Sequence, residues 1–151
     1  MLNTGKYGLP QDYAKALELW HRAAELGYAP SYYSIGAAYY CGDGVGVERN
    51  EKKAVHYFEL AAMGGDVIAR YNLGVIEFNA GNMDRALKHH MIAVGMGKSN
   101  SLEKIKLLFM SGDATKDDYA KALQVYQANL VEIKSPQRDE AAAFDDAYTY
   151  Y

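Results

Sequence analysis

The sequence predicts an all-α fold made of tandem helix pairs, and three observations support this prediction. One template recurs four times, with an Asp or Asn, a Lys or Arg three residues later, an Ala, an aliphatic residue, and a ring four residues after the Ala. A Gly follows the Asp or Asn by fifteen residues in the first three copies, and a different pattern with a central Gly lies between the copies. Such recurrence is typical of helical-repeat proteins. The copies are Asp12-Lys15-Ala16-Leu17-Trp20, Asn50-Lys53-Ala54-Val55-Phe58, Asn82-Arg85-Ala86-Leu87-His90 and Asp118-Lys121-Ala122-Leu123-Tyr126.

The template segments predict amphipathic helices. In the first of them, Ala16, Leu17, Trp20, Ala23 and Ala24 recur at helical spacing and form one apolar stripe. The Asp or Asn can accept a hydrogen bond from a free N–H at the start of a helix, and the Gly can end that helix in the left-handed conformation. We expect helices of about 14 residues, roughly 21 Å long. The expected N-cap residues are Asp12, Asn50, Asn82 and Asp118, and the expected terminal glycines are Gly27, Gly65 and Gly97.

The segments between the templates predict a second set of helices. They are Tyr33–Tyr40 and Tyr71–Phe78, with a weaker third copy at Leu102–Phe109. A Gly inside a helix costs about 1 kcal/mol relative to Ala, so the recurrence of Gly36 and Gly74 indicates that two helices touch there without room for a side chain. In the third copy a Lys replaces this Gly, and we expect a wider or bent contact.

We expect that the chain begins inside a repeat. Residues 5–12 are similar to the loop that precedes the second template helix, but no first helix comes before them. The helix expected over residues 13–26 would therefore expose apolar surface unless something upstream covers it. Further repeats or another domain could precede this segment.

A separate terminal segment is expected at the other end. Ser135 is a suitable N-cap and Pro136 a suitable first helical residue, so we predict a short capping helix followed by a frayed tail. The chain then divides into a repeat array over residues 1–134 and a terminal segment over residues 135–151.

Composition argues against several classes of function. The formal net charge is −3 and the sequence pI is about 5.8, so we expect no basic surface for nucleic acid. No apolar run approaches the roughly 18 residues of a membrane span, and no apolar segment follows Met1 as in a signal peptide. The single cysteine fits a reducing compartment. We expect a cytoplasmic protein that does not insert into a membrane.

These motifs resemble the Sel1-like repeat (SLR) family, which is related to the tetratricopeptide repeats. The family signature is similar to A-x-Y-x-L-G-x-x-Y-x-x-G-x-G-V, a polar stretch, K-A, an aromatic residue, and A-A-x-x-G. The resemblance covers nearly all of residues 5–134, and the last unit departs from it at Lys106, Asn129 and Ile133. It implies a right-handed α-α superhelix of antiparallel helix pairs. The matching residues are Tyr33, Ile35, Gly36, Tyr39, Gly42, Gly44, Val45, Lys53, Ala54, Tyr57, Phe58, Ala61, Ala62 and Gly65.

The resemblance also implies a protein-binding groove, because SLR proteins are adaptors and scaffolds in signalling, protein quality control and membrane-protein degradation. In this repeat class the first helices line the concave face. The Tyr three residues before the Gly faces the ligand, as do the residues one and four after it. A Tyr ring offers area and a polar tip at small entropic cost, although several of these rings could instead pack between helices. The corresponding positions are Tyr33, Ala37, Tyr40, Tyr71, Val75 and Phe78, followed in the third copy by Glu103, Leu107 and Met110.

No catalytic residue, metal site or cofactor is predicted. The candidates for such chemistry are His21, His56, His89 and His90. Adjacent residues on a helix point about 100° apart, and His90 occupies the ring position of the template, so a structural role is favoured. Cys41 lacks a partner cysteine and is expected to be a small apolar filler. The Gly42–Gly46 run lies between two helices and not after a strand, which favours a connector over a phosphate loop.

We therefore predict a non-catalytic scaffold or adaptor that binds a peptide or helical segment of a protein on its concave groove. A second hypothesis is that these repeats recruit substrates for a larger enzyme, such as a zinc-binding ubiquitin ligase whose catalytic domain lies outside this chain. A third is a hydrolase that uses the histidines and binds a metal. The partner, the pathway and the oligomeric state stay open.

Overall fold

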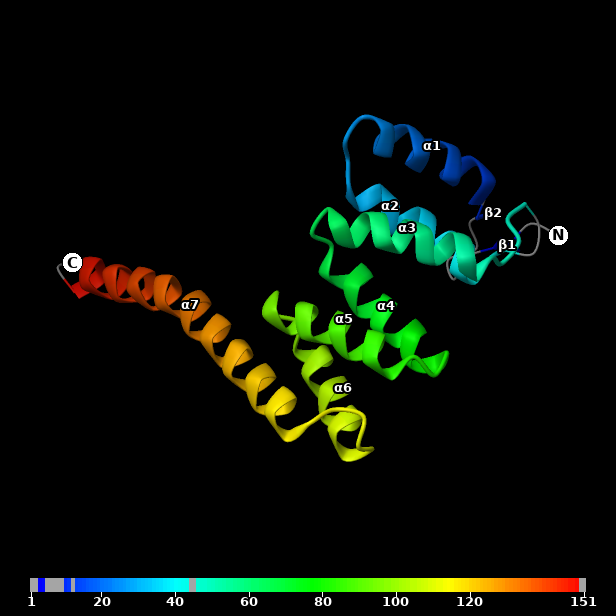
Figure 1. Ribbon diagram of the computed structural model, residues 1–151. Coiled ribbons are helices and arrows are strands. Elements are labelled where there is room, and N and C mark those ends of the chain that lie inside the picture. Colours follow the sequence, from blue (N-terminus) through cyan, green and yellow to red (C-terminus); the bar gives the residue numbers. More distant parts are fainter. Residues whose placement is uncertain (1–2, 5–9, 12, 44–45, 150–151) are drawn as a thin grey trace. The chain divides into compact units, whose positions relative to one another are not determined.

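Figure 1 shows the protein as a computed structural model, which describes residues 3–4, 10–11, 13–43 and 46–149. Over these residues it contains seven helices, which confirms the predicted all-α fold class. The template segments form α1, α3, α5 and α7, and the segments with the central Gly or its replacement form α2, α4 and α6. The helices are α1 (Tyr13–Glu25), α2 (Pro30–Cys41), α3 (Glu51–Met63), α4 (Val67–Asn79), α5 (Met83–Gly95), α6 (Ser99–Met110) and α7 (Lys116–Thr149).

Two short strands precede the helices. The strands β1 (Asn3–Thr4) and β2 (Pro10–Gln11) pair in antiparallel orientation, with Asn3 opposite Gln11. We predicted a loop over residues 5–12, and β2 corrects that prediction; residues 5–9 and 12 lie outside the described residues. A ladder of two residues has no alternating apolar pattern that could have predicted it.

The chain divides into two compact units, Met1–Ile76 and Glu77–Tyr151. The first contains α1, α2, α3 and most of α4, and the second contains the end of α4 and the helices from α5 to α7. Each unit has a hydrophobic core of its own. The boundary of the repeat array at residue 134 stays a prediction.

In the first unit, α2 packs against both α1 and α3. On the α1 side, Leu17 and Ala24 are buried against a cluster that includes Ile35 of α2, while Trp20 packs on this cluster and stays partly exposed. On the α3 side, the template residue Phe58 is 2% exposed. The core that contains Phe58 continues into α4, where its buried members are Ala69, Leu73 and Ile76.

Gly36 allows α2 and α3 to approach closely. A Cβ atom at this position would lie 2.7 Å from Cδ1 of Phe58 and 3.2 Å from the carbonyl oxygen of Ala54. The first of these separations is shorter than carbon atoms tolerate. The prediction that no side chain fits at the central Gly is therefore confirmed in α2. In α6 the replacing residue, Lys106, is exposed.

The template helices end at the predicted glycines in the first three copies. Gly27, Gly65 and Gly97 have φ angles of 94°, 94° and 91°, in the left-handed region that glycine adopts at little cost. The N–H of Asp66, which follows Gly65, donates to the carbonyl oxygen of Ala61 at 3.0 Å and closes the last turn of α3. The glycine signal in the sequence was therefore sufficient to place these helix ends.

Asn50 and Asn82 stand at the predicted N-cap positions of α3 and α5, but only Asn50 makes the predicted side-chain hydrogen bond. Asn50 Oδ1 accepts a hydrogen bond from the Lys53 N–H at 3.1 Å. Asn82 makes no such cap, and its side-chain amide instead donates to Glu77 Oε2 at 2.7 Å. The Asn82 side chain thus acts as a donor to a carboxylate, and its oxygen accepts no hydrogen bond from the first turn of α5. Asp12 lies outside the described residues.

The fourth template helix, α7, begins earlier than predicted. Its first residue is Lys116, and Thr115 and Asp118 form a reciprocal capping box before and inside the first turn. The Asp118 N–H donates to Thr115 Oγ1 at 3.1 Å, and the Thr115 N–H donates to Asp118 Oδ2 at 2.9 Å. The hydrogen bond from the Thr115 N–H, followed by one from the Thr115 side chain, holds the pKa of the Asp118 carboxyl below its usual value. Asp118 is therefore the third residue of the helix, not its N-cap.

The prediction of a separate helix beginning at Ser135-Pro136 is wrong, because α7 continues to Thr149 without a break. The terminal Gly of the template is replaced here by Ile133, so the residue type that ends α1, α3 and α5 is missing. A proline inside a helix removes one N–H donor, and its ring crowds the carbonyl oxygen four residues earlier, which costs about 3 kcal/mol. The helix nevertheless continues through Pro136.

The core of the second unit joins α5, α6 and α7 around Val94, Ile105 and Ala122, all 0% exposed. His90 is also buried, and its Nδ1 lies 3.3 Å from Oγ of the buried Ser101. Asn129, which replaces the late Ala of the template, donates from Nδ2 to the carbonyl oxygen of Gly95 at 2.6 Å. This amide thus bonds to the last residue of α5, so the departure at Asn129 preserves the contact between α5 and α7 in another form.

Candidate functional site

Three of the predicted groove residues lie on α2 and pack partly into the core. The ring centroids of Tyr33 and Tyr40 lie 5.7 and 6.4 Å from that of Phe58. Ala37 is also partly buried against the same cluster. Arg49 lies over the Tyr40 ring, with Cζ 5.4 Å from the centroid, and its Nε donates to the Tyr40 carbonyl oxygen at 3.0 Å. These contacts hold the Tyr40 ring in place at the edge of the core.

The other three predicted residues lie on α4. Tyr71 and Val75 are partly buried, and Phe78 is 38% exposed. Phe78 belongs to the second compact unit, so the predicted set is divided between the two units. In the third copy, Leu107 and Met110 of α6 are 51% and 71% exposed.

A hollow of about 130 Å³ brings together two of the six predicted residues, Tyr40 and Val75. We call it the groove pocket. Phe58, Asn72 and Ile76 complete its lining. Sequence reasoning missed Phe58 because it assigned that ring to the core, where most of it does lie. It missed Asn72 because only positions of the repeat signature were considered. A polar residue among apolar neighbours on α4 was the available signal.

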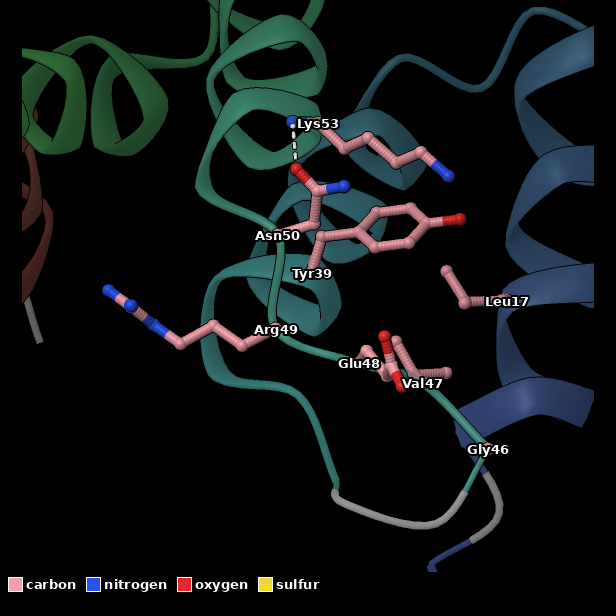
Figure 2. A pocket seen from close by; sticks show the side chains of 8 residues that line it. All are labelled: Leu17, Tyr39, Gly46, Val47, Glu48, Arg49, Asn50 and Lys53. Carbon is pink, nitrogen blue, oxygen red and sulfur yellow. Dashed lines mark hydrogen bonds between the residues drawn. The ribbon is translucent and has the colours of Figure 1, made fainter.

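A second hollow, of about 290 Å³, lies where α1, α2, α3 and the segment before α3 meet (Figure 2). We call it the loop pocket. Sequence analysis did not predict it, because its lining comes from four segments that the helical pattern does not relate. The lining residues are Leu17, Tyr39, Gly46, Val47, Glu48, Arg49, Asn50 and Lys53.

Charged groups border the loop pocket on two sides. The Lys53 ammonium lies over the Tyr39 ring, 5.1 Å from the centroid, as the side chains in Figure 2 show. The carboxylate of Glu48 forms no ion pair with a described residue, and neither does Lys53. Arg49 instead pairs with Glu51 at 3.3 Å, and its side chain points away from the other lining residues (Figure 2).

An aromatic cluster lies beside this pocket. The Tyr57 ring stacks with Tyr32 and Tyr39 at centroid distances of 6.4 and 5.9 Å, and its edges contact His21 and His56 at 5.5 and 5.1 Å. Burial, followed by the charges of Tyr39 and Tyr32, raises the pKa of Tyr57. His21 and His56 thus pack against a ring, which is the structural role that we expected.

The remaining candidates for chemistry are structural or isolated. Burial is the main cause that lowers the pKa of His90 from 6.5 to about 4, and the charge of Lys104 and then His89 lower it further. Cys41 is exposed, so the prediction of an apolar filler is wrong; it is the last residue of α2, where the helix reaches the surface. In the described part of the chain, no group of three or more His, Cys, Asp or Glu side chains could hold a metal ion.

A third hollow, of about 570 Å³, lies in the second unit between α5 and the start of α7. Leu87, Met91 and Ile92 supply its apolar lining, and Asp84 and Asp118 border it. Separately, none of the described helices combines the length and the apolar content that a membrane span requires.

Comparisons with known proteins match this architecture. Residues 1–28 and 29–66 each match the Sel1 repeat family model, and the second match includes Tyr40 and Phe58 of the groove pocket. A curated relative from Arabidopsis thaliana, the ERAD-associated E3 ubiquitin-protein ligase component HRD3B, is 38% identical over 85 residues. That alignment covers 56% of this chain and 13% of the relative.

Two solved structures are similar in fold. One is a protective antigen of uropathogenic Escherichia coli strains that displays an SLR fold, with a TM-score of 0.63 and 29% identity. The other is a Sel1 repeat protein from Oxalobacter formigenes, with a TM-score of 0.64 and 27% identity. Each comparison covers 80% of this chain, but 26% and 51% of the respective neighbour.

Proposed function

Because the chain is a Sel1-like repeat protein, from a family whose repeats generally mediate protein–protein interactions without catalysis, we propose that it is a scaffold or adaptor that binds a peptide or helical segment. The segment lies along the groove between α2 and α4 and places one apolar side chain in the groove pocket. The observation that supports this proposal best is the groove pocket itself, which is lined by Tyr40 and Val75.

The size and lining of the groove pocket suit a single apolar side chain. Its volume of about 130 Å³ is close to that of the protein cavities of about 150 Å³ that accept benzene. Phe58, which is 2% exposed, forms a fixed wall, and Ile76 is 8% exposed. A wall that is already packed loses little entropy on binding, so burial of the ligand side chain is retained as affinity.

Asn72 gives the pocket a polar group beside its apolar wall. Its side-chain amide makes no hydrogen bond with another described residue, although it is only partly exposed. A side-chain amide can donate to a carbonyl oxygen and accept from an N–H, which matches both groups of a peptide bond. We infer that Asn72 holds the main chain of the bound segment while the pocket receives its side chain.

The proposal is tested with peptides selected against the immobilised wild-type protein from a random peptide library. Val75→Asp places a charge in the pocket and should weaken the selected peptides by about tenfold or more, since changes at interface hot spots cost about 2 kcal/mol or more. Asn72→Ala leaves the apolar wall intact and should weaken them less. Affinities are measured by fluorescence anisotropy.

Met63→Asp is the matched control, because Met63 is 80% exposed on α3 and does not line the groove pocket. Far-UV circular dichroism establishes that each variant keeps its helix content. Equal affinity of the wild type, Val75→Asp and Asn72→Ala for every selected peptide would refute the groove.

One comparison favours a second candidate function. The Arabidopsis thaliana relative is named as a component of an E3 ubiquitin-protein ligase, and it is 38% identical to this chain over 85 residues. We propose as the alternative that these repeats recruit substrates within such an assembly. A complex purified from the source cells through this chain should then transfer ubiquitin in the presence of activating and conjugating enzymes, and a complex without that activity would exclude the alternative.

A further inference from the structure

We propose that the loop pocket is a second peptide site, which binds an acidic side chain together with an apolar neighbouring residue of the same peptide. It is separate from the groove pocket, and none of its lining residues is shared with it. Its volume of about 290 Å³ accommodates more than one side chain. The proposal does not depend on binding at the groove between α2 and α4.

The pocket is already formed in the unbound protein. The N–H of Asn50 donates to the carbonyl oxygen of Tyr39 at 2.7 Å, which ties the segment before α3 to α2. Within that segment, Asp43 Oδ1 accepts from the N–H groups of Gly46 and Val47 at 3.0 and 2.9 Å. A pocket whose walls are fixed in this way requires little ordering when a ligand enters.

The floor of the loop pocket is apolar and well packed. Leu17 from α1 and Val47 from the loop are 8% and 4% exposed, and both belong to one hydrophobic cluster. The ring of Tyr39 forms the adjoining wall, as Figure 2 shows. An apolar ligand residue placed on these three side chains would be removed from water, which favours binding.

Two hydrogen-bond donors border the same pocket. Asn50 Oδ1 is used by the Lys53 N–H, and Figure 2 shows its amide nitrogen on the side of Tyr39 and the Lys53 side chain. This nitrogen makes no hydrogen bond with a described residue, and Lys53 forms no ion pair with one. A carboxylate can accept from an amide and an ammonium group together, with stronger bonds than a neutral acceptor makes.

Glu48 determines which side of the pocket a carboxylate can occupy. Its own carboxylate lines the pocket, so it repels a ligand carboxylate and restricts it to the side of Lys53 and Asn50. Arg49 adds little positive charge to the pocket, because its guanidinium is paired with Glu51. Removing the charge of Glu48 should therefore strengthen binding, which a pocket for an apolar residue alone would not do.

The test uses NMR titration of the full chain with labelled methyl groups and backbone amides. The probes are N-acetyl-Glu-Leu-amide and N-acetyl-Gln-Leu-amide, which differ only in the charge of one side chain. The first should shift the methyl signals of Leu17 and Val47 in a saturable manner. N-acetyl-Gln-Leu-amide should bind roughly fivefold more weakly than the Glu probe, because a charge-assisted hydrogen bond becomes a neutral one.

Matched variants localise the effect. Lys53→Met should reduce affinity for the Glu probe to that for the Gln probe, whereas Lys52→Met removes an equal charge from a neighbouring exposed residue outside the pocket and should change affinity little. Glu48→Gln should raise the affinity for the Glu probe. Val75→Asp should leave it unchanged, which separates this site from the groove pocket.

Three results would overturn the proposal. Equal binding of the two probes would show that the carboxylate is not recognised, and equal losses in the two lysine variants would show that only general charge matters. If N-acetyl-Gln-Leu with a free C-terminal carboxylate bound more tightly than N-acetyl-Glu-Leu-amide, the site would take a chain terminus and not an acidic side chain. Amide spectra of each variant establish that the fold is kept.

Discussion

Phe58 and His90 occupy the same position of the repeat template but are held in the core by different interactions. Phe58 lies against the bare backbone of Gly36, where a Cβ atom would come within 2.7 Å of its ring. His90 is equally buried, and its imidazole lies within hydrogen-bond distance of Ser101. A ring is therefore required at this position by packing, whereas its chemistry can vary when the neighbouring helix offers a polar partner.

Gly36→Ala should destabilise the protein although Ala is the better helix former. The helix propensity gain is about 1 kcal/mol. The methyl group would overlap the ring of Phe58, which is too buried to move aside, and overpacking of this kind costs about 1–3 kcal/mol. We expect a net loss of about 1 kcal/mol, and of at most about 2 kcal/mol, in the free energy of unfolding, measured with urea.

Gly95→Ala is the control for this substitution. A Cβ atom at Gly95 would meet only Cγ1 of Val125, at 3.8 Å, which is an ordinary contact. This variant should be as stable as the wild type or slightly more stable. If both variants gained stability, the close contact between α2 and α3 would not constrain position 36.

The buried His90 should make stability depend on pH. Its pKa is lowered to about 4 in the folded protein, while an unfolded chain binds a proton below about pH 6.5. The unfolded state therefore holds more protons between these values, and the free energy of unfolding should fall by up to about 3 kcal/mol as the pH decreases from 6.5 to 4. Above pH 6.5 this contribution is constant.

His90→Phe should remove that pH dependence while keeping a ring at the template position. The variant loses the bond to Ser101 at every pH, so the informative quantity is the difference between its urea stabilities at pH 7 and pH 4.5. His56→Phe alters an exposed histidine and should retain the wild-type slope. If His90→Phe kept the wild-type dependence of unfolding free energy on pH, His90 would not be the group that causes it.

At the scale of the helix, the ends were harder to predict than the interiors. The glycine positions predicted three ends correctly because a left-handed residue is nearly specific to glycine. Asparagine is less specific: Asn50 caps α3, while Asn82 bonds to Glu77. Which acceptor or donor an amide finds depends on side chains brought near it by folding, and a sequence pattern does not contain that information.

Thr115 and Asn82, which precede the first residues of α7 and α5, provide a test of this difference. Thr115→Ala removes the acceptor of the Asp118 N–H at the start of α7 and should cost about 1 kcal/mol in unfolding free energy. Asn82→Ala removes only an exposed bond to Glu77 and should cost less. Urea unfolding followed by circular dichroism measures both, and equal losses would show that the template Asn matters for another reason.

The same reasoning explains the length of α7. Its continuation past residue 134 follows from the absence of the terminal Gly, a feature visible in the sequence as Ile133. We gave more weight to Ser135-Pro136, a good start for a helix, than to the missing stop signal before it. A start signal is informative only where the preceding helix has already ended.

At the scale of the molecule, the number and order of the helices could be predicted because one template recurs four times. The template Ala is 0% exposed at Ala54, Ala86 and Ala122, so these copies occupy equivalent environments. Ala16 is partly exposed. Whereas α2 precedes α3 and packs against it, no helix precedes α1 in the described residues. The division into two compact units was not predicted, since repetition of one pattern does not indicate where contacts become sparse.

The candidate site was predictable only where it belongs to the repeat. Tyr40 and Val75 occupy signature positions and do line the groove pocket. Asn72 and the whole loop pocket were missed, because a pocket formed by several segments depends on their three-dimensional arrangement. Periodicity identifies faces of helices, and it does not reveal spaces left between loops and helices.

Trp20 is the only tryptophan of the chain, and it lies in the first compact unit. Indole emission therefore reports on that unit alone, while ellipticity at 222 nm follows the helices of both. Coincident denaturation profiles from the two signals would mean that the halves melt as one cooperative block, and separate profiles would mean that each melts on its own. A single native fluorophore thus allows cooperativity along the repeats to be measured without labelling.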